Sequence, residues 1–432
     1  MTSSGKLDTF SLAALLVGAN YGLGFILGTA ENSLTQGIGG SLYAVSTGLG
    51  LFALAGLAQF YWRTEQPIWT LLGDRYGSFL KTAIGMMSWM WMVGVVAAQI
   101  LGGSFVLHCL GIPLSASMAA MAVLFATLSL LSVERVGQIF RGLLVLNSLI
   151  IFYALGRLDG FSGYANIPVE FVSALANIPT SQQLGIVLTT VLLIPIGMQF
   201  QVFLVQAAGR QTAVRGCLLG GIALILLAFV PSEMTIAASN AGILPDGISG
   251  KAIVPFVFSW LGGGIGAPMG IFLVLCLLFS ALGSGSGLLR AMNQTLFELE
   301  LLPRRNDVRI LVAIANVLLA WAIASGGGSI IGLMVSFYAL YVAAVWVPFL
   351  AYLLDRGGRF EFTKTSIQFA VLSGGISGIG VLIATFAIPE AAIGGSQQLS
   401  ILSIGMGFAL LGLIFGQAID KYATAIRPSK QS

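Results

Sequence analysis

Charged residues are scarce in this chain of 432 residues: Asp, Glu, Lys and Arg make up 8% of it, against roughly a quarter of a soluble domain. Hydrophobic residues make up 57%, and the mean hydropathy is +0.96. This many apolar side chains cannot all be buried in the core of a water-soluble protein. Most of the protein surface must therefore face lipid. The composition excludes a soluble globular protein and indicates a polytopic membrane protein.

Residues that carry out catalysis are equally scarce. His108 is the single histidine, and the three cysteines, Cys109, Cys217 and Cys276, are far apart, with neither a disulfide nor a metal-ligand spacing. The sequence has no HExxH motif, no Walker loop and no Ser/His/Asp constellation. We therefore expect no enzyme, no catalytic cofactor and no nucleic-acid partner.

Long apolar segments make up most of the sequence. Twelve of them approach or exceed the roughly 20 residues that a helix needs to cross the hydrocarbon layer, which predicts an all-α fold of about twelve transmembrane helices in a single domain, residues 1–432. The predicted spans are 10–30, 37–61, 81–107, 112–132, 138–156, 184–206, 213–237, 265–290, 308–325, 329–354, 368–388 and 398–419.

The basic residues give the orientation, because Lys and Arg near span ends are retained in the cytoplasm. With a cytoplasmic N-terminus, 18 of the 20 Lys and Arg fall in cytoplasmic segments, and only Arg157 and Lys251 fall outside. We expect both termini in the cytoplasm and a multi-pass protein of the cell (cytoplasmic or inner) membrane.

Two predicted spans contain helix-breaking residues near their middle. Span 10–30 holds GANYGLG at 18–24, and span 184–206 holds IPIGMQ at 194–199. Irregular backbone at membrane depth survives only where it lines a cavity. The breaks open two consecutive five-span blocks, 10–156 and 184–354, and an odd-numbered block reverses its membrane direction on repetition. This predicts an inverted repeat with a binding site at the midplane, followed by two additional helices, 368–419.

Four segments in order resemble the solute:sodium symporter family, whose members share the LeuT-type five-plus-five inverted repeat. Residues 65–77 (EQPIWTLLGDRYG) resemble its cytoplasmic Arg-Tyr-Gly segment, and residues 97–103 (AAQILGG) its Gln-Leu-small-Gly run. Residues 206–216 (QAAGRQTAVRG) and 281–289 (ALGSGSGLL) are similar to its patterns after span 6 and in span 8. The family's extra N-terminal helix is missing here, so we expect the chain to begin directly at the first repeat.

The resemblance implies a sodium site between the first break and the eighth span, built from oxygen ligands as a hard cation requires. It implies carbonyl ligands from Gly18, Tyr21 and Ala281 and a hydroxyl from Ser284. The second hydroxyl of the family pattern is absent, since Gly285 occupies its place, and Ser286 is the nearby substitute.

The predicted substrate site lies beside the breaks, where half-helices leave backbone groups free. Its candidate side chains are amides, phenols, hydroxyls and a thioether, without Arg, Lys or His: Asn20, Tyr21, Tyr43, Ser46, Gln99, Met198, Gln199, Gln201, Tyr338 and Tyr341. A neutral set favours a small neutral or zwitterionic solute. We interpret Trp89, Trp91, Phe337 and Trp346 as packing or interfacial residues.

The leading hypothesis is a sodium-coupled secondary active transporter that works by alternating access, as a monomer with a homo-oligomer as the alternative. Glu31 and Glu233 are the acidic residues closest to the bilayer, and they would serve a proton-coupled protein. An uncoupled transporter, a channel and a sensor-like relative also stay open.

Overall fold

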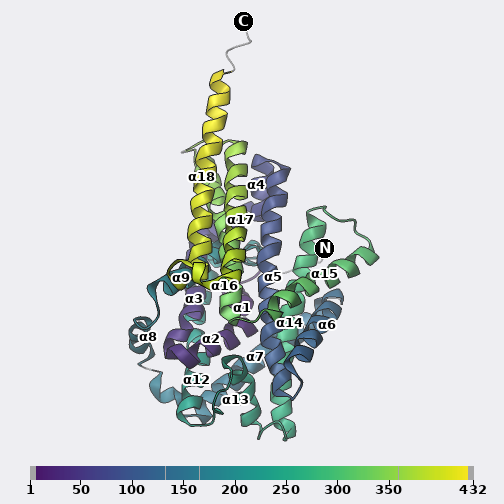
Figure 1. Ribbon diagram of the computed structural model, residues 1–432, viewed down its shortest axis with the longest axis vertical. Coiled ribbons are helices and arrows are strands. Elements are labelled where there is room, and N and C mark those ends of the chain that lie inside the picture. Colours follow the sequence, from purple (N-terminus) through teal and green to yellow (C-terminus); the bar gives the residue numbers. More distant parts are fainter. Residues whose placement is uncertain (1–5, 132, 165, 359, 427–432) are drawn as a thin grey trace.

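The computed structural model describes residues 6–131, 133–164, 166–358 and 360–426. All the long elements in these ranges are α-helices, so the prediction of an all-α fold is confirmed. Figure 1 shows α18 projecting at one end of the molecule and α8, α12 and α13 at the other.

The first five predicted spans correspond to helices in order. Their bounds are α1 Thr9–Asn20, α2 Leu23–Gln36, α3 Leu42–Thr64, α4 Ile68–Tyr76, α5 Ser78–Cys109, α6 Leu114–Leu130 and α7 Val133–Arg157. The sequence did not predict the short α4 after α3, and span 37–61 begins as a 3₁₀ helix, η1 Gly37–Ser41. Ser132, the last residue of span 112–132, lies outside the described residues.

The next five spans follow the same plan. Their bounds are α8 Ile167–Leu175, α9 Thr180–Ile196, α10 Met198–Val205, α11 Arg210–Ala228, α12 Val230–Asn240, η3 Gly250–Ala252, α13 Ile253–Leu261, α14 Pro268–Glu298, α15 Asn306–Ser325 and α16 Ile330–Arg356. The connecting helices α8 and α13 were not predicted, and α8 meets α9 at an angle of 118°.

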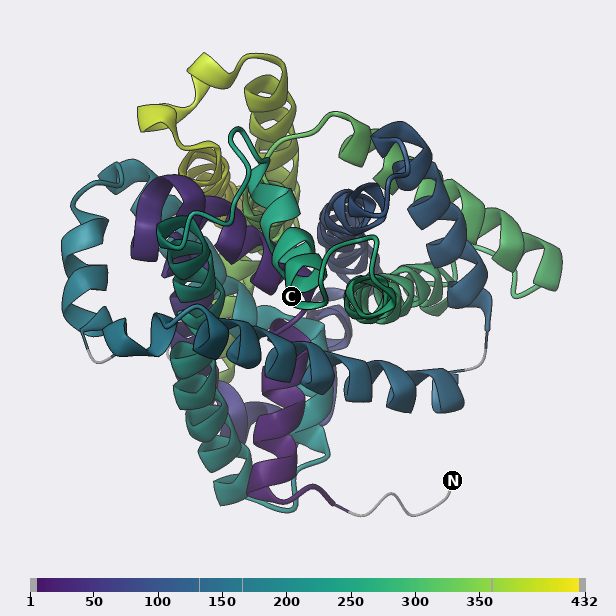
Figure 2. The ribbon, with the colours of Figure 1, turned by 90° about the horizontal axis from the view of Figure 1, so that it is seen from below.

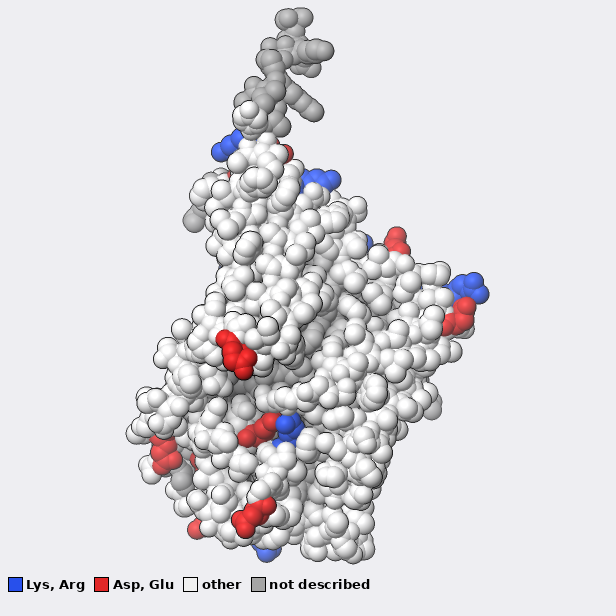
Figure 3. Space-filling view, viewed as in Figure 1, with Lys and Arg blue, Asp and Glu red and all other residues white. Residues whose placement is uncertain are grey.

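The chain ends in a helix pair, α17 Lys364–Ala387 and α18 Gln397–Ile426. The two lie side by side in Figures 1 and 2 and pack against α16. In the described chain, eight helices are long and apolar enough to cross a membrane, and Figure 3 shows a face with few charged side chains. The protein is a multi-pass membrane protein, while the count of twelve spans stays a prediction.

Contacts between helices occur in matching pairs: when each helix is replaced by its counterpart in the other five-span block, the contact is found again. Helix α1 packs against α11, and its counterpart α9 packs against α3. Likewise α5 contacts α15 and α16, whereas α14 contacts α6 and α7. Figure 2 shows α1 and α11 side by side. A five-plus-five repeat produces such paired contacts, although the repeat boundaries stay a prediction.

Close helix crossings depend on glycine at the centre of the bundle. A Cβ added at Gly94 of α5 would run into the ring of Phe337 on α16. Glycine therefore lets α5 and α16 approach each other, as small residues do at membrane helix interfaces. Both helices are largely buried and form the wall that carries Gln99 and Tyr338.

Candidate functional site

The first break separates α1 from α2 at Tyr21 and Gly22, where it was predicted. Asn20 contributes to it, because its side-chain nitrogen donates to the Leu16 carbonyl at 2.9 Å. The Gly22 N–H turns back to the Asn20 carbonyl at 2.8 Å, and Gly22 is extended at φ −101° and ψ −173°. The chain restarts as a helix at Leu23.

The second break separates α9 from α10 at Gly197, also where it was predicted. Pro195 lies in the last turn of α9 and has no N–H to continue the helix. Gly197 is extended, with φ −69° and ψ 120°, and caps α10. Both confirmed breaks result from Gly, Asn and Pro, whose local chemistry opposes a continuous helix.

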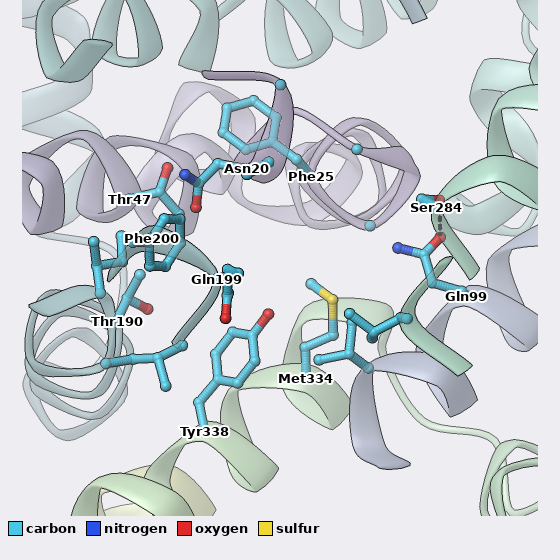
Figure 4. Close-up of a pocket in the computed structure, with 18 of the residues that line it drawn as sticks. Asn20, Phe25, Thr47, Gln99, Thr190, Gln199, Phe200, Ser284, Met334 and Tyr338 are labelled. Atoms are coloured by element: carbon cyan, nitrogen blue, oxygen red, sulfur yellow. Dashed lines mark hydrogen bonds between the residues drawn. The ribbon is translucent and has the colours of Figure 1, made fainter. Parts of the chain in front are cut away.

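A cavity of about 470 Å³ lies between the two breaks. None of the described residues that line it is charged. Those with polar or aromatic side chains are Asn20, Phe25, Tyr43, Thr47, Trp91, Gln99, Thr190, Gln199, Phe200, Phe203, Ser284 and Tyr338. Figure 4 shows many of these side chains arranged around the open space. The size falls within the range of small-molecule sites.

Seven of the predicted site residues line this cavity. Of the proposed substrate residues these are Asn20, Tyr43, Gln99, Gln199 and Tyr338, and of the proposed sodium ligands they are Gly18 and Ser284.

The other residues predicted for the substrate and sodium sites do not line the cavity: Tyr21, Ser46, Met198, Gln201, Ala281, Ser286 and Tyr341. Several of them bond elsewhere. Ser46 donates to the Leu42 carbonyl at 2.6 Å within its own helix. Ser286 donates to the Gly283 carbonyl at 3.5 Å. Gln201 accepts from the Ile68 N–H at 3.3 Å, which fixes α4 against α10.

The two breaks differ in what their carbonyl groups can bind. At the first, the carbonyls of Gly18, Ala19 and Tyr21 accept no hydrogen bond from any residue that the structure describes. The last carbonyl groups of a helix have no donor within that helix, and Gly18 and Ala19 are exposed where they line the cavity. These oxygens are therefore available to a ligand or cation, and two of them are proposed sodium ligands.

At the second break every carbonyl in the last turn of α9 is occupied. The Tyr61 hydroxyl donates to the Pro195 carbonyl at 2.7 Å, and the Trp346 indole donates to the Leu192 carbonyl at 2.6 Å. The Ile196 carbonyl accepts from the Tyr341 hydroxyl and the Gln201 amide, each at 3.2 Å.

The Gly197 N–H donates to the two remaining carbonyls, those of Leu193 at 2.8 Å and Ile194 at 3.3 Å. Helix α9 thus ends in a sealed carbonyl cap, defined as the carbonyl groups of 192–196 with these donors. Each carbonyl of the cap thus has at least one donor from the protein, unlike the three open carbonyls of the first break.

Ser284 and Gln99 form the polar part of the cavity wall on α14 and α5. The Ser284 hydroxyl donates to the Gln99 side-chain oxygen at 3.4 Å and approaches the Ala281 carbonyl at 3.2 Å. Figure 4 places this pair across the cavity from Asn20. At the neighbouring Gly285, an added Cβ would run into the ring of Phe125, so packing accounts for the missing second hydroxyl.

The sequence reasoning missed several lining residues, among them Thr47, Thr190 and Trp91. Trp91 was interpreted as packing, yet it lines the cavity. The other three aromatic residues do pack: Trp89 donates to Asn316, Trp346 to Leu192, and Phe337 covers Gly94. Helical spacing could have found Thr47 and Trp91, since Thr47 lies four residues after Tyr43 and Trp91 eight residues before Gln99, each pair on one helix face.

The two acidic candidates lie at the far end of α2 and in α12. Glu31 pairs with Lys251 at 2.9 Å and accepts the Ile330 N–H at 2.9 Å, and Lys251 lies over the Phe105 ring at 5.5 Å. Four elements, α2, η3, α16 and α5, meet at this outer junction, defined by Glu31, Lys251, Phe105 and Ile330. Glu233 is buried in α12. Neither residue lines the cavity.

The segment before α1, at the end of that helix away from the first break, pairs through backbone hydrogen bonds with the segment after α10. Leu7, just before α1, donates to the Gln206 carbonyl and accepts from the Ala208 N–H, each at 2.8 Å. The Trp62 indole donates to the Ala207 carbonyl between them at 3.1 Å. We name this contact, Leu7 with 206–208, the inner junction.

Chemically, the site offers carbonyl, carboxamide and hydroxyl oxygens. Among the described residues, no group of three or more His, Cys, Asp and Glu is placed to hold a metal ion. Neutral oxygen atoms suit a hard monovalent cation and a polar solute.

No protein-family model matches the sequence, and no curated protein matches it. Solved structures do match the fold. A Na⁺-coupled sialic acid symporter is 15% identical, with a TM-score of 0.57 and coverage of 95% of this chain and 90% of that one.

Two other transporters are comparably similar. Mhp1, a nucleobase-cation-symport-1 family transporter, is 13% identical, with a TM-score of 0.54 and coverage of 99% and 95%. A manganese transporter of Eremococcus coleocola is 17% identical, with a TM-score of 0.53 and coverage of 97% of both chains. Identities this low concern the fold alone. The chain therefore has the LeuT-type transporter fold, with its two broken helices around a central cavity.

Proposed function

We propose that the protein is a secondary active transporter that carries a small neutral or zwitterionic organic solute by alternating access, coupled to sodium. The observation that carries this proposal is the uncharged cavity between two broken helices, with open carbonyls at the first. Helix ends and free backbone groups at the midplane are how such folds hold solutes and ions. We assign the chain to the solute:sodium symporter family on its four sequence segments.

In this proposal sodium binds the carbonyls of Gly18, Tyr21 and Ala281 and the hydroxyl of Ser284. Because Ser284 lies across the cavity from Asn20, ion binding draws the first break toward α14. Because the inner junction lies just before α1 and the outer junction includes Glu31 of α2, this movement couples ion binding to both junctions.

The proposed arrangement in the membrane follows from the basic residues. Both termini are cytoplasmic, the inner junction faces the cytoplasm and the outer junction faces outside, in the cell membrane. The repeats comprise 10–156 and 184–354, and a monomer contains the whole site.

Counterflow tests the proposed function. Liposomes with the purified protein are loaded with a candidate solute, and entry of labelled solute is measured with sodium or with choline on both sides. A transporter gives saturable, transient accumulation that requires sodium. Flux that rises linearly with concentration, without counterflow, would identify a channel instead.

The specific alternative is proton coupling through Glu31 or Glu233. The ion pair favours a different task for Glu31, because its carboxylate is already bonded to Lys251 and to the Ile330 N–H. Loss of either partner of a pair this little exposed leaves the other charge uncompensated. Glu31→Gln and Lys251→Met are therefore predicted to alter uptake alike, by loosening the outer junction.

Uptake by both variants is measured with and without a proton gradient. Glu390→Gln, which changes an exposed carboxylate after α17, is the matched control and leaves uptake unchanged. Proton coupling through Glu31 predicts another pattern: Glu31→Gln alone abolishes gradient-driven uptake while Lys251→Met retains it. The same assay on Glu233→Gln tests the second carboxylate.

A further inference from the structure

A second cavity, of about 360 Å³, lies outside the candidate solute site and is lined by residues of α3, α9 and α16. Helix α9 packs against both α3 and α16 and forms the floor between them. Beside the cavity, the rings of Phe60 on α3 and Phe349 on α16 meet edge-on, with centroids 6.1 Å apart. The cavity is therefore a groove between two helices that a third helix holds apart.

The groove is apolar. Its described lining residues are aliphatic or glycine apart from Trp346, and none of them is charged. The Trp346 indole N–H is already used, because it donates to the Leu192 carbonyl of the carbonyl cap at 2.6 Å. A polar solute would lose its hydrogen bonds to water in such a groove without replacement. The walls therefore suit a hydrocarbon chain.

The groove opens to the outside of the helix bundle. Helix α16 is almost entirely buried as far as Phe349, and Leu350 is then 45% exposed. On α3, Gly56 is exposed, and a Cβ added to it would meet no atom within 4 Å. Both residues lie in segments long and apolar enough to cross a membrane. The surroundings of the groove are therefore the acyl chains of the bilayer.

An apolar groove does not by itself select one lipid from the bilayer. An acyl chain gains little hydrophobic free energy when it leaves other acyl chains for an equally apolar wall. Selection must then come from the polar head group, at the end of the groove that lies near the membrane surface.

That end of the groove carries a cation. Arg356 lies one helical turn after Leu353, which lines the groove, and its guanidinium lies over the Phe60 ring at 5.2 Å. A cation is attracted to the face of an aromatic ring. The Phe60 ring therefore holds the positive charge close to the groove.

No carboxylate in the described chain lies within ion-pairing distance of Arg356. The neighbouring Asp355 is bonded instead to Arg75 at 3.1 Å and to the Tyr76 hydroxyl at 2.6 Å. Asp74 lines the same recess as Arg356 but forms no ion pair with it. The charge of Arg356 is thus available to an anionic group of a lipid.

We propose that this groove binds one acyl chain of an anionic phospholipid, whose phosphate is held by Arg356. The chain lies against Gly56, Leu57, Pro195, Trp346, Leu350 and Leu353. It covers the hydrogen bond between Trp346 and Leu192, so the lipid supports the carbonyl cap. The proposal goes beyond transport and uses the proposed orientation only to place the lipid in the cytoplasmic leaflet, which is rich in anionic lipids.

Native mass spectrometry of the delipidated, full-length protein in detergent tests this proposal. The protein is titrated with phosphatidylglycerol, with phosphatidylcholine, and with glycerol 3-phosphate, which has the charge but no chain. We expect one saturable site that prefers phosphatidylglycerol to phosphatidylcholine about fivefold, the contribution of one basic residue beside anionic lipid. Equal affinity for the two lipids, or binding of glycerol 3-phosphate as tight as that of phosphatidylglycerol, would overturn the proposal.

Gly56→Leu tests the chain site, because the added side chain enters open space and occupies the groove without a clash. It should weaken the binding of phosphatidylglycerol about tenfold or more. Gly380→Leu is the matched control: Gly380 is an exposed glycine of α17, and a Cβ there also meets no atom within 4 Å. Unchanged binding in Gly56→Leu, or an equal loss in Gly380→Leu, would contradict the placement.

Arg356→Gln tests the head-group site without changing the groove. It should bring the affinity for phosphatidylglycerol down to that for phosphatidylcholine and leave the latter unchanged. The matched control is Arg309→Gln, which removes an exposed arginine in the first turn of α15. A lipid preference that persists in Arg356→Gln, or that is lost equally in Arg309→Gln, would show that Arg356 does not hold the phosphate.

Discussion

Ser284→Ala should raise the sodium concentration that gives half-maximal uptake by about tenfold or more. Ser284 offers the cavity its hydroxyl beside Gln99 and the Ala281 carbonyl, and it supplies the one side-chain oxygen of the proposed ion site. Affinity for a hard cation depends on the number of its oxygen ligands. A loss of about 1.4 kcal/mol in ion binding corresponds to that tenfold change. Uptake is measured against sodium concentration at constant ionic strength.

Ser286→Ala is the matched control, since it removes a hydroxyl two residues away that donates to the Gly283 carbonyl and does not line the cavity. Its sodium dependence should stay close to that of the parent protein. Uptake by the parent protein that is indifferent to sodium would overturn the ion assignment. A shift in Ser286→Ala without one in Ser284→Ala would move the ligand to Ser286, and equal shifts in both would contradict the assignment to Ser284 alone.

The breaks could be predicted from sequence because their causes are local. A single Gly or Pro does not suffice, since Gly94 lies inside the continuous α5 and Pro348 inside α16. The clusters at 18–24 and 194–199 marked the two breaks. Asn20, Gln99 and Gln199 could be found for a similar reason, since a carboxamide within an apolar run needs a partner. These parts of the site require no knowledge of the neighbouring helices.

The remaining site residues depend on contacts between helices, which one sequence does not contain. Gln201 and Tyr341 are as polar as Gln199 and Tyr338, yet they bond to the Ile196 carbonyl and do not line the cavity. Gly285 departs from the family pattern because the Phe125 ring of α6 fills the space beside it. Trp89 and Trp91 lie two residues apart in α5, and only the helix face on which each lies decides which of them lines the cavity.

Tyr61→Phe should destabilise the protein by about 1–3 kcal/mol, the cost of leaving a buried carbonyl unpaired. The Tyr61 hydroxyl is the one side-chain donor in the described chain to the Pro195 carbonyl, at 2.7 Å, and Tyr61 is 1% exposed. The substitution keeps the ring, which stacks on Phe349 with centroids 6.3 Å apart. The loss is therefore that of one hydrogen bond at the carbonyl cap, measured as a lower thermal unfolding temperature in a constant detergent.

Tyr341→Phe separates the cap from a general effect of losing a buried hydroxyl. Its acceptor, the Ile196 carbonyl, keeps the Gln201 amide at 3.2 Å, so no carbonyl is left unpaired and the destabilisation should be clearly smaller. Sodium provides a second measurement, because a freed Pro195 carbonyl restores an open oxygen at the second break. Tyr61→Phe should then gain more thermal stability from added sodium than Tyr341→Phe does. Equal destabilisation by the two variants, with equal responses to sodium, would show that the cap does not control which break can bind a cation.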